Sequence, residues 1–236
     1  MNPNRLARIA GVLYLLVGIF GGFAEGYVYP KLFVAGNAAA TAANVVANPG
    51  LVRMGVVADL LDSTFFVFLV ITLYILLKHV HRSVAFAMVI LVALAAGITC
   101  LNTVFEFEGL RVATDSSFAA AFGIGGSNAL VLTLLDMQHY GLLAAQVFFG
   151  LWLAPLGYLA YKSGLFPKAL GVLLGAGAVC YLVDVLVAFL LPDFAQKIHA
   201  FVVIPSAIAE LSMVGYLLVI GVKSIKPRAE RVLAAA

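Results

Sequence analysis

Charged side chains are scarce in this sequence. Asp, Glu, Lys and Arg make up 11% of its 236 residues, whereas 64% of the residues are hydrophobic. Soluble domains typically have about 25% charged and about 45–50% apolar residues. A soluble core of this size could not bury so much apolar surface, so part of the surroundings must be lipid. The shortage of charge therefore excludes an ordinary soluble domain and predicts an integral membrane protein.

Cysteines and the common catalytic signatures are also few or missing. The two cysteines, Cys100 and Cys180, lie inside apolar runs with no paired spacing, which excludes a disulfide framework or a structural zinc site. We find no Ser–His–Asp arrangement, phosphate-binding loop, dinucleotide fingerprint or CxxCH heme motif. The sequence therefore leaves the cofactor unknown, and it predicts no nucleic-acid partner.

Six apolar windows are each long enough to cross a bilayer, which requires about 20 helical residues. The windows are 9–28, 54–77, 83–106, 138–161, 169–191 and 201–222. No strand alternation or convincing internal repeat interrupts this pattern. We therefore predict an all-α, polytopic membrane helix bundle with six transmembrane helices, organised as a single domain over residues 1–236. The first window follows a basic start as in a secretory signal, but no clear small-residue cleavage site follows it, so we interpret it as an uncleaved membrane helix.

Three connections between the windows are long or polar enough to interpret. Residues 36–50, rich in Ala and Asn and ended by Pro-Gly, are predicted to form a short surface helix. The glycines and serines of 109–129 favour a loop with a re-entrant or interfacial piece. The segment PDFAQKIH precedes the last window and is interpreted as a connection, which makes His199 an outer-loop residue.

The basic residues predict the orientation of the helices, because Lys and Arg are enriched on the cytoplasmic side. With the N-terminus inside, ten of the 14 basic residues lie on the inner side and four on the outer side. The inner ten are Arg5, Arg8, Lys78, Arg82, Lys162, Lys168, Lys223, Lys226, Arg228 and Arg231. The outer four are Lys31, Arg53, Arg111 and Lys197. We therefore predict a multi-pass protein of the inner (plasma) membrane with both termini cytoplasmic.

Acidic residues occur on every predicted helix and always in its outer half. Residues three or four apart share a helix face, and Asp59/Asp62 and Asp136/His139 are spaced in this way. Ionisable side chains in membranes usually face the bundle interior or a water-filled cavity. We therefore predict one outward-opening, carboxylate-rich cavity. Its candidate catalytic residues are Asp59, Asp62, Glu106, Asp136, His139, Asp184 and Glu210.

Several functions fit such a cavity. Few basic residues are placed to neutralise the acids, so the layer must hold protons or a cation. A membrane-embedded enzyme that uses the carboxylates and His139 as acid and base on a lipid-like or small apolar substrate is the first interpretation. A proton- or cation-coupled transporter or channel is the second, and a non-catalytic ligand-binding or accessory protein is the third. The sequence leaves open a homodimer, a bound metal near Asp136 and His139, and a purely structural role in joining helices.

Two stretches resemble a known family. They are RIAGVLYLLVGIFGGFAE (8–25) and the segment 148–184, which contains GLWLAPLGY. With these stretches, the sequence resembles the bacterial domain-of-unknown-function family four-three-eight-six. The resemblance covers nearly the whole chain. The resemblance implies a small bacterial polytopic membrane protein. It implies no activity, so no catalytic residue is carried over from it.

Overall fold

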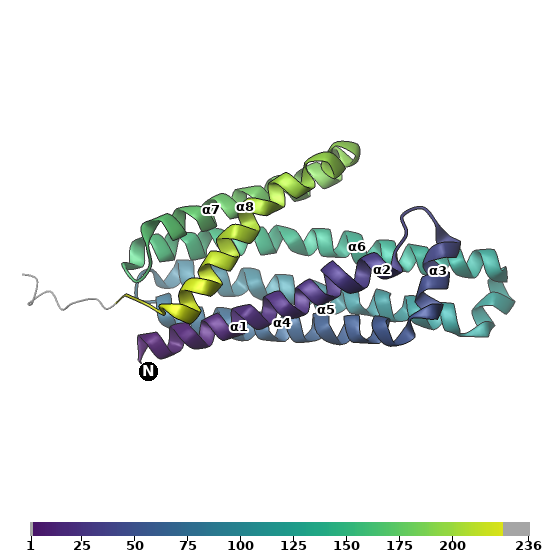
Figure 1. Cartoon of the computed structure of the whole chain (residues 1–236), viewed down its shortest axis with the longest axis horizontal. Helices are drawn as coiled ribbons and strands as arrows, with labels where there is room; N and C mark the ends of the chain where they lie inside the picture. Colours follow the sequence, from purple (N-terminus) through teal and green to yellow (C-terminus); the bar gives the residue numbers. More distant parts are fainter. Residues whose placement is uncertain (1, 224–236) are drawn as a thin grey trace, which may run out of the picture. The chain divides into compact units, whose positions relative to one another are not determined.

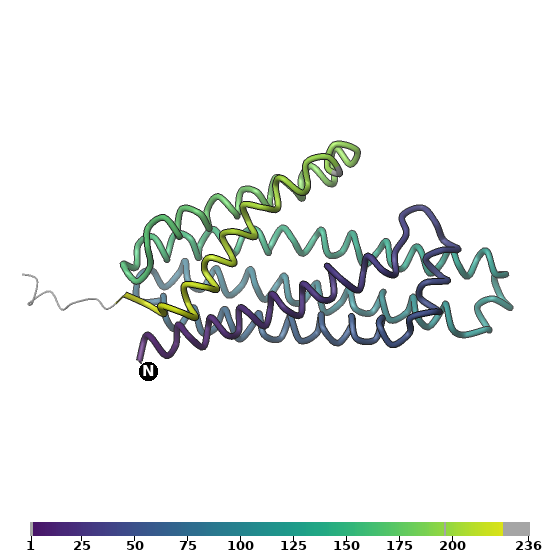
Figure 2. The backbone as a smooth tube through the Cα atoms, viewed as in Figure 1, coloured from purple at the N-terminus to yellow at the C-terminus, as the bar shows by residue number. Residues whose placement is uncertain are grey.

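The computed structural model describes residues 2–223, which are almost entirely helical and contain no strand. Figure 1 shows the helices, and Figure 2 traces the backbone through them. In chain order they are α1 (Pro3–Phe23), the π-helix η1 (Ala24–Val28), α2 (Tyr29–Leu32), α3 (Ala38–Ala47), α4 (Pro49–Leu77), α5 (Arg82–Thr114), α6 (Ser116–Ser163), α7 (Lys168–Leu190) and α8 (Pro192–Val219).

Within the described residues, six helical segments are long and apolar enough to span a membrane, which confirms the predicted fold class. They are Pro3–Leu32, Pro49–Leu77, Arg82–Thr114, Ser116–Ser163, Lys168–Leu190 and Lys197–Val219. Each contains most of one predicted window. The cytoplasmic location of the termini stays a prediction, and three of the basic residues on which it rests, Lys226, Arg228 and Arg231, lie outside the described residues.

The chain forms two compact units. The first unit consists of residues 2–12, 70–90 and 150–223, and the second of Leu13–Leu69 and Leu91–Phe149. The helices α1, α4, α5 and α6 contribute residues to both units, α3 belongs to the second, and α7 and α8 belong to the first.

The core of the second unit is an apolar cluster around the short helix α3. Ala42 and Val45 of α3 are buried against Val28, Leu110 and Val131. The N-terminus of α3 is capped by Asn37, whose side chain accepts a hydrogen bond from the backbone N–H of Ala40 at 3.0 Å. The prediction of a short helix within 36–50 is therefore confirmed.

In the first unit, α7 and α8 pack closely against each other and lie side by side in Figure 1. The buried Ser206 hydroxyl of α8 donates a hydrogen bond of 3.0 Å to the Gly177 carbonyl of α7. The helix α6 also approaches α7 closely. A Cβ atom added at Gly157 of α6 would lie only 2.7 Å from the carbonyl oxygen of Gly171 in α7. Small residues thus allow the close backbone approach typical of membrane helices.

Two predicted connections are wrong. The predicted loop 109–129 is helical: α5 continues to Thr114, α6 begins at Ser116, and Gly123 alone within α6 has non-helical backbone angles (φ 72°, ψ 162°). The segment PDFAQKIH forms the first turns of α8, so His199 lies in a helix and not in an outer loop. In both places helix satisfies backbone groups that a loop in an apolar environment would leave without hydrogen bonds.

Candidate functional site

Four acidic side chains of the second unit form what we call the carboxylate cluster: Glu25, Asp59, Asp62 and Glu106. Asp59 and Asp62 come from α4, Glu106 from α5 and Glu25 from η1. Glu25 interacts electrostatically with both aspartates, and Glu106 interacts with Asp59 and Glu25. The π-helical turn that carries Glu25 is a rare conformation often found at functional sites.

Three of the four acids are buried within the protein, and Glu25 is half-buried. Asp59, Asp62 and Glu106 have relative exposures of 5%, 7% and 6%. Within residues 2–223, no Lys, Arg or His forms an ion pair with Glu25, Asp59 or Glu106. Burial of an uncompensated charge costs several kcal/mol, so these carboxyls must be protonated, share protons or meet a cation.

Three glycines make room for the polar side chains between the helices. A Cβ at Gly21 of α1 would lie 3.1 Å from Asp62 Oδ1, and one at Gly55 of α4 would lie 2.8 Å from Glu106 Oε1. A Cβ at Gly141 of α6 would overlap the carboxamide of Asn102. Each polar side chain therefore fills the space left by a glycine on a neighbouring helix.

Two amide side chains extend the cluster towards α6. Gln138 donates a hydrogen bond from Nε2 to Glu25 Oε1 at 3.0 Å. Asn102 donates a long hydrogen bond, 3.5 Å, from Nδ2 to the backbone carbonyl of Gln138. Both amides are buried. The hydrogen bond between Glu25 and α6 is therefore made by the side chain of Gln138.

Several buried polar atoms of the second unit have no hydrogen-bond partner in the described part of the chain. They are Tyr29 OH, Ser63 Oγ, Thr99 Oγ1, Gln138 Oε1 and Gln146 Oε1. Ser63, Thr99 and Gln138 are only 2%, 4% and 3% exposed. A buried unpaired polar atom costs about 1–3 kcal/mol, so each points to a water or a ligand group that would satisfy it.

An aromatic group brings Asp136 and His139 towards the cluster. The His139 ring stacks on Tyr29 with a centroid distance of 5.8 Å and on Phe33 with one of 6.4 Å. Tyr29 interacts electrostatically with both Asp136 and Glu25. The structure thus brings five predicted site residues, Asp59, Asp62, Glu106, Asp136 and His139, into the second unit, where Glu25 and Tyr29 link them.

The remaining two predicted residues, Asp184 and Glu210, belong to the first unit. Both carboxylate oxygens of the buried Asp184 lie 3.0 Å from Nδ1 of His199, whose side chain is 58% exposed. Tyr181 hydrogen-bonds to Glu210 and interacts electrostatically with Asp184. These four side chains form a separate network within their unit, and convergence of all seven predicted residues in one pocket stays a prediction.

Sequence reasoning missed the neutral partners of the acids. Gln138 lies next to His139 in the sequence, and Tyr29 lies four residues after Glu25, so spacing alone offered a weak signal for both. Glu25 is likewise not among the candidate residues predicted from the sequence. The pairing of His199 with Asp184 is not predicted from the sequence, because the segment that contains His199 is predicted to be a connection and not a helix.

A metal centre is not apparent. In the described ranges, no three His, Cys, Asp or Glu side chains are arranged so that they could hold a metal ion. Among residues 2–223, Asp136 and His139 therefore lack a second pair of ligands.

Comparison with known proteins gives one match. No curated protein and no solved structure shows significant similarity to the chain. A family model described as a domain of unknown function, DUF4386, matches residues 9–221, which include most of both units and the whole carboxylate cluster. Six candidate membrane spans lie in the described part of the chain, which belongs to the DUF4386 family.

Proposed function

We propose that the protein is a membrane-embedded enzyme whose carboxylate cluster transfers protons to and from a lipid-like or small apolar substrate. The observation that carries this proposal is the burial of Asp59 and Glu106 beside Glu25 with no basic partner among the described residues. General acid–base catalysis requires one group that holds a proton and another that has released it. Buried carboxyls that interact electrostatically can differ in protonation and so supply both.

The hydrogen-bonding groups around the cluster support this chemistry. Gln138 fixes one oxygen of Glu25, which leaves the other carboxyl oxygen to exchange a proton. The unpartnered atoms Ser63 Oγ, Thr99 Oγ1 and Gln138 Oε1 are groups that could orient a polar substrate atom. His139, held by stacking on Tyr29, is the candidate base on the α6 side.

A lipid-conversion assay tests the proposal. The full chain is reconstituted in vesicles made from a bacterial lipid extract, and the lipid species are followed by mass spectrometry. We expect the wild type to convert at least one species and Asp59→Asn, which preserves shape but removes the titrating group, to lose this activity. Glu108→Gln is the matched control, because Glu108 is a more exposed acid that pairs with Arg111 at 3.3 Å. An unchanged lipid profile, or equal activity of Asp59→Asn and wild type, would refute the enzymatic role.

A proton-coupled carrier is the second candidate. It is favoured by the same unpartnered hydroxyl and amide atoms, since chains of such groups and water conduct protons in transporters. Vesicles that contain a pH-sensitive dye distinguish the two functions. Proton flux that Asp59→Asn abolishes, without any lipid conversion by the wild type, would favour the carrier over the enzyme.

A further inference from the structure

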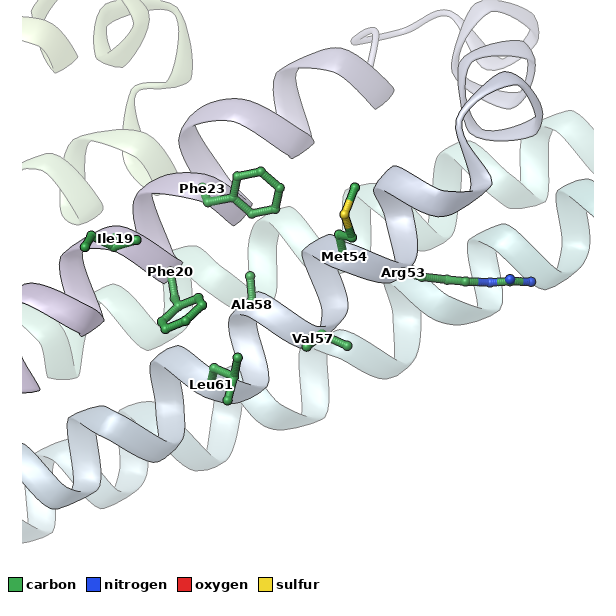
Figure 3. A pocket seen from close by; sticks show the side chains of 8 residues that line it. All are labelled: Ile19, Phe20, Phe23, Arg53, Met54, Val57, Ala58 and Leu61. Atoms are coloured by element: carbon green, nitrogen blue, oxygen red, sulfur yellow. The ribbon is translucent and has the colours of Figure 1, made fainter.

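The second unit has an apolar groove between α1 and α4, with a volume of about 440 Å³. Ile19, Phe20 and Phe23 line it from α1, and Figure 3 shows them opposite the side chains from α4. The α4 side consists of Arg53, Met54, Val57, Ala58 and Leu61. Its volume lies in the range of ordinary ligand sites, about 300–1,000 Å³.

The lining of the groove is almost entirely apolar, and one charged group extends beyond its end. Arg53 is the single charged lining residue, and in Figure 3 its side chain extends away from the apolar side chains. Leu61 is eight positions after Arg53, which corresponds to about 12 Å along a helix. A guanidinium binds phosphate oxygens with paired hydrogen bonds and stays charged at any physiological pH. The groove therefore matches a molecule with a phosphate at one end and a hydrocarbon chain beyond it.

The groove also lies beside the carboxylate cluster along α4. The lining residues of α4 follow one face of the helix at spacings of three and four: Met54, Val57, Ala58 and Leu61. Asp59 and Asp62 lie on the adjacent face, because each comes one position after one of these residues. Adjacent positions are separated by about 100° around the helix axis, so the two faces are neighbours. A chain bound in the groove would therefore lie against the helix that carries two of the acids.

We propose that this groove binds an acyl chain of an anionic phospholipid, with the lipid phosphate held by Arg53. A zwitterionic lipid carries the same phosphate, but its own cation competes with Arg53 for that charge, so it should bind more weakly. That this lipid is the substrate of the carboxylate cluster rests on the proposed function. Its binding in the groove does not.

The test measures lipid binding without any reaction. The full chain in an uncharged detergent is titrated with phosphatidylglycerol or with phosphatidylcholine of the same acyl chains, and bound lipid is counted by native mass spectrometry. We expect phosphatidylglycerol to bind at least about tenfold more tightly, and Arg53→Gln to remove about tenfold of its affinity. Arg111→Gln is the matched control, because Arg111 is an exposed arginine outside the groove.

A second pair of variants tests the apolar part. Val57→Trp places a large side chain in the groove from a position that is 55% exposed, so the fold should tolerate it, whereas Leu101→Trp adds the same bulk at an exposed site on α5. We expect Val57→Trp to lose bound phosphatidylglycerol and Leu101→Trp to retain it.

Three results would overturn the lipid site. They are equal affinities for the two lipids, wild-type binding by Val57→Trp, and binding of inorganic phosphate as tight as that of phosphatidylglycerol. None of them would affect the lipid-conversion test of Asp59→Asn, so failure of the groove and failure of the acid–base site are distinguishable.

Discussion

The contact between Gly141 and Asn102 gives a sharp test of how the polar side chains of the second unit are held. A Cβ at Gly141 would overlap the carboxamide of Asn102, and the three nearest atoms all belong to that one side chain. Overpacking of a well-packed interior typically costs about 1–3 kcal/mol. Alanine is favoured over glycine in a helix by about 1 kcal/mol, so Gly141→Ala should lower the free energy of unfolding by about 0–2 kcal/mol.

A double variant separates the clash from other effects of the substitution. Asn102→Ala removes the overlapping carboxamide together with one long hydrogen bond, so it should cost about 1 kcal/mol alone. In Gly141→Ala/Asn102→Ala the clash is gone and the helix preference of alanine remains. The two changes should therefore be non-additive, with a coupling free energy of about 1–3 kcal/mol in favour of the double variant.

Thermal unfolding of the purified chain in detergent measures these differences. Gly97→Ala is the control, because Gly97 lies within α5 and a Cβ there would meet nothing within 4 Å. We expect Gly97→Ala to leave the midpoint unchanged or to raise it. If the double variant is as unstable as the sum of the two single variants, Asn102 does not occupy the space that Gly141 leaves, and the packing of α5 on α6 described above is wrong.

Other predictions concern a helix terminus and the first unit. The backbone N–H of Ser117 donates a hydrogen bond to the Asp115 carboxylate, which lowers the pKa of Asp115. The ionised carboxylate should therefore stabilise the start of α6 above the ordinary aspartate pKa, and this stabilisation should be lost as the pH falls through the lowered pKa. Amide hydrogen exchange should show the loss in the wild type and not in Asp115→Asn. His199→Ala should lower the unfolding midpoint because it leaves the buried Asp184 without its hydrogen bond, at a cost of about 1 kcal/mol, and a midpoint equal to that of wild type would contradict this pairing. Ser206→Ala should cost about 0.5–1 kcal/mol through loss of one interhelical hydrogen bond, and unchanged thermal unfolding would show that this bond contributes nothing.

The six spans could be predicted because they depend on length and hydropathy alone. The loop 109–129 could not, because glycine and serine favour turns when water can bind the backbone, whereas an apolar environment favours continued helix. Here α5 and α6 are separated by Asp115 alone, and Gly123 is the one further departure from helical angles within the segment. The prediction of a connection before the last span was also wrong. Pro192 is compatible with the first turn of a helix, and α8 begins at this residue.

The candidate site was partly predictable. Helical spacing and depth brought together Asp59, Asp62 and Glu106, because these depend on periodicity within single helices. The partners across helices depend on how far one helix is shifted and rotated against the next, which a single sequence does not contain. Two glycines illustrate this limit. Gly18 and Gly55 both lie within apolar helical segments, but a Cβ atom at Gly55 would meet the Glu106 carboxylate, whereas one at Gly18 would meet nothing within 4 Å.

The unpartnered polar atoms of the second unit are not explained by direct contacts between the helices alone. Polar side chains that only join membrane helices contribute through the hydrogen bonds they make, each about 1 kcal/mol. Ser63 Oγ and Thr99 Oγ1 make none among the described residues, and burying them unpaired costs about 1–3 kcal/mol each. Alanine and valine would fill the same space without that cost. Both hydroxyls share the second unit with Asp59 and Glu106, and bound water or a polar ligand group would satisfy them.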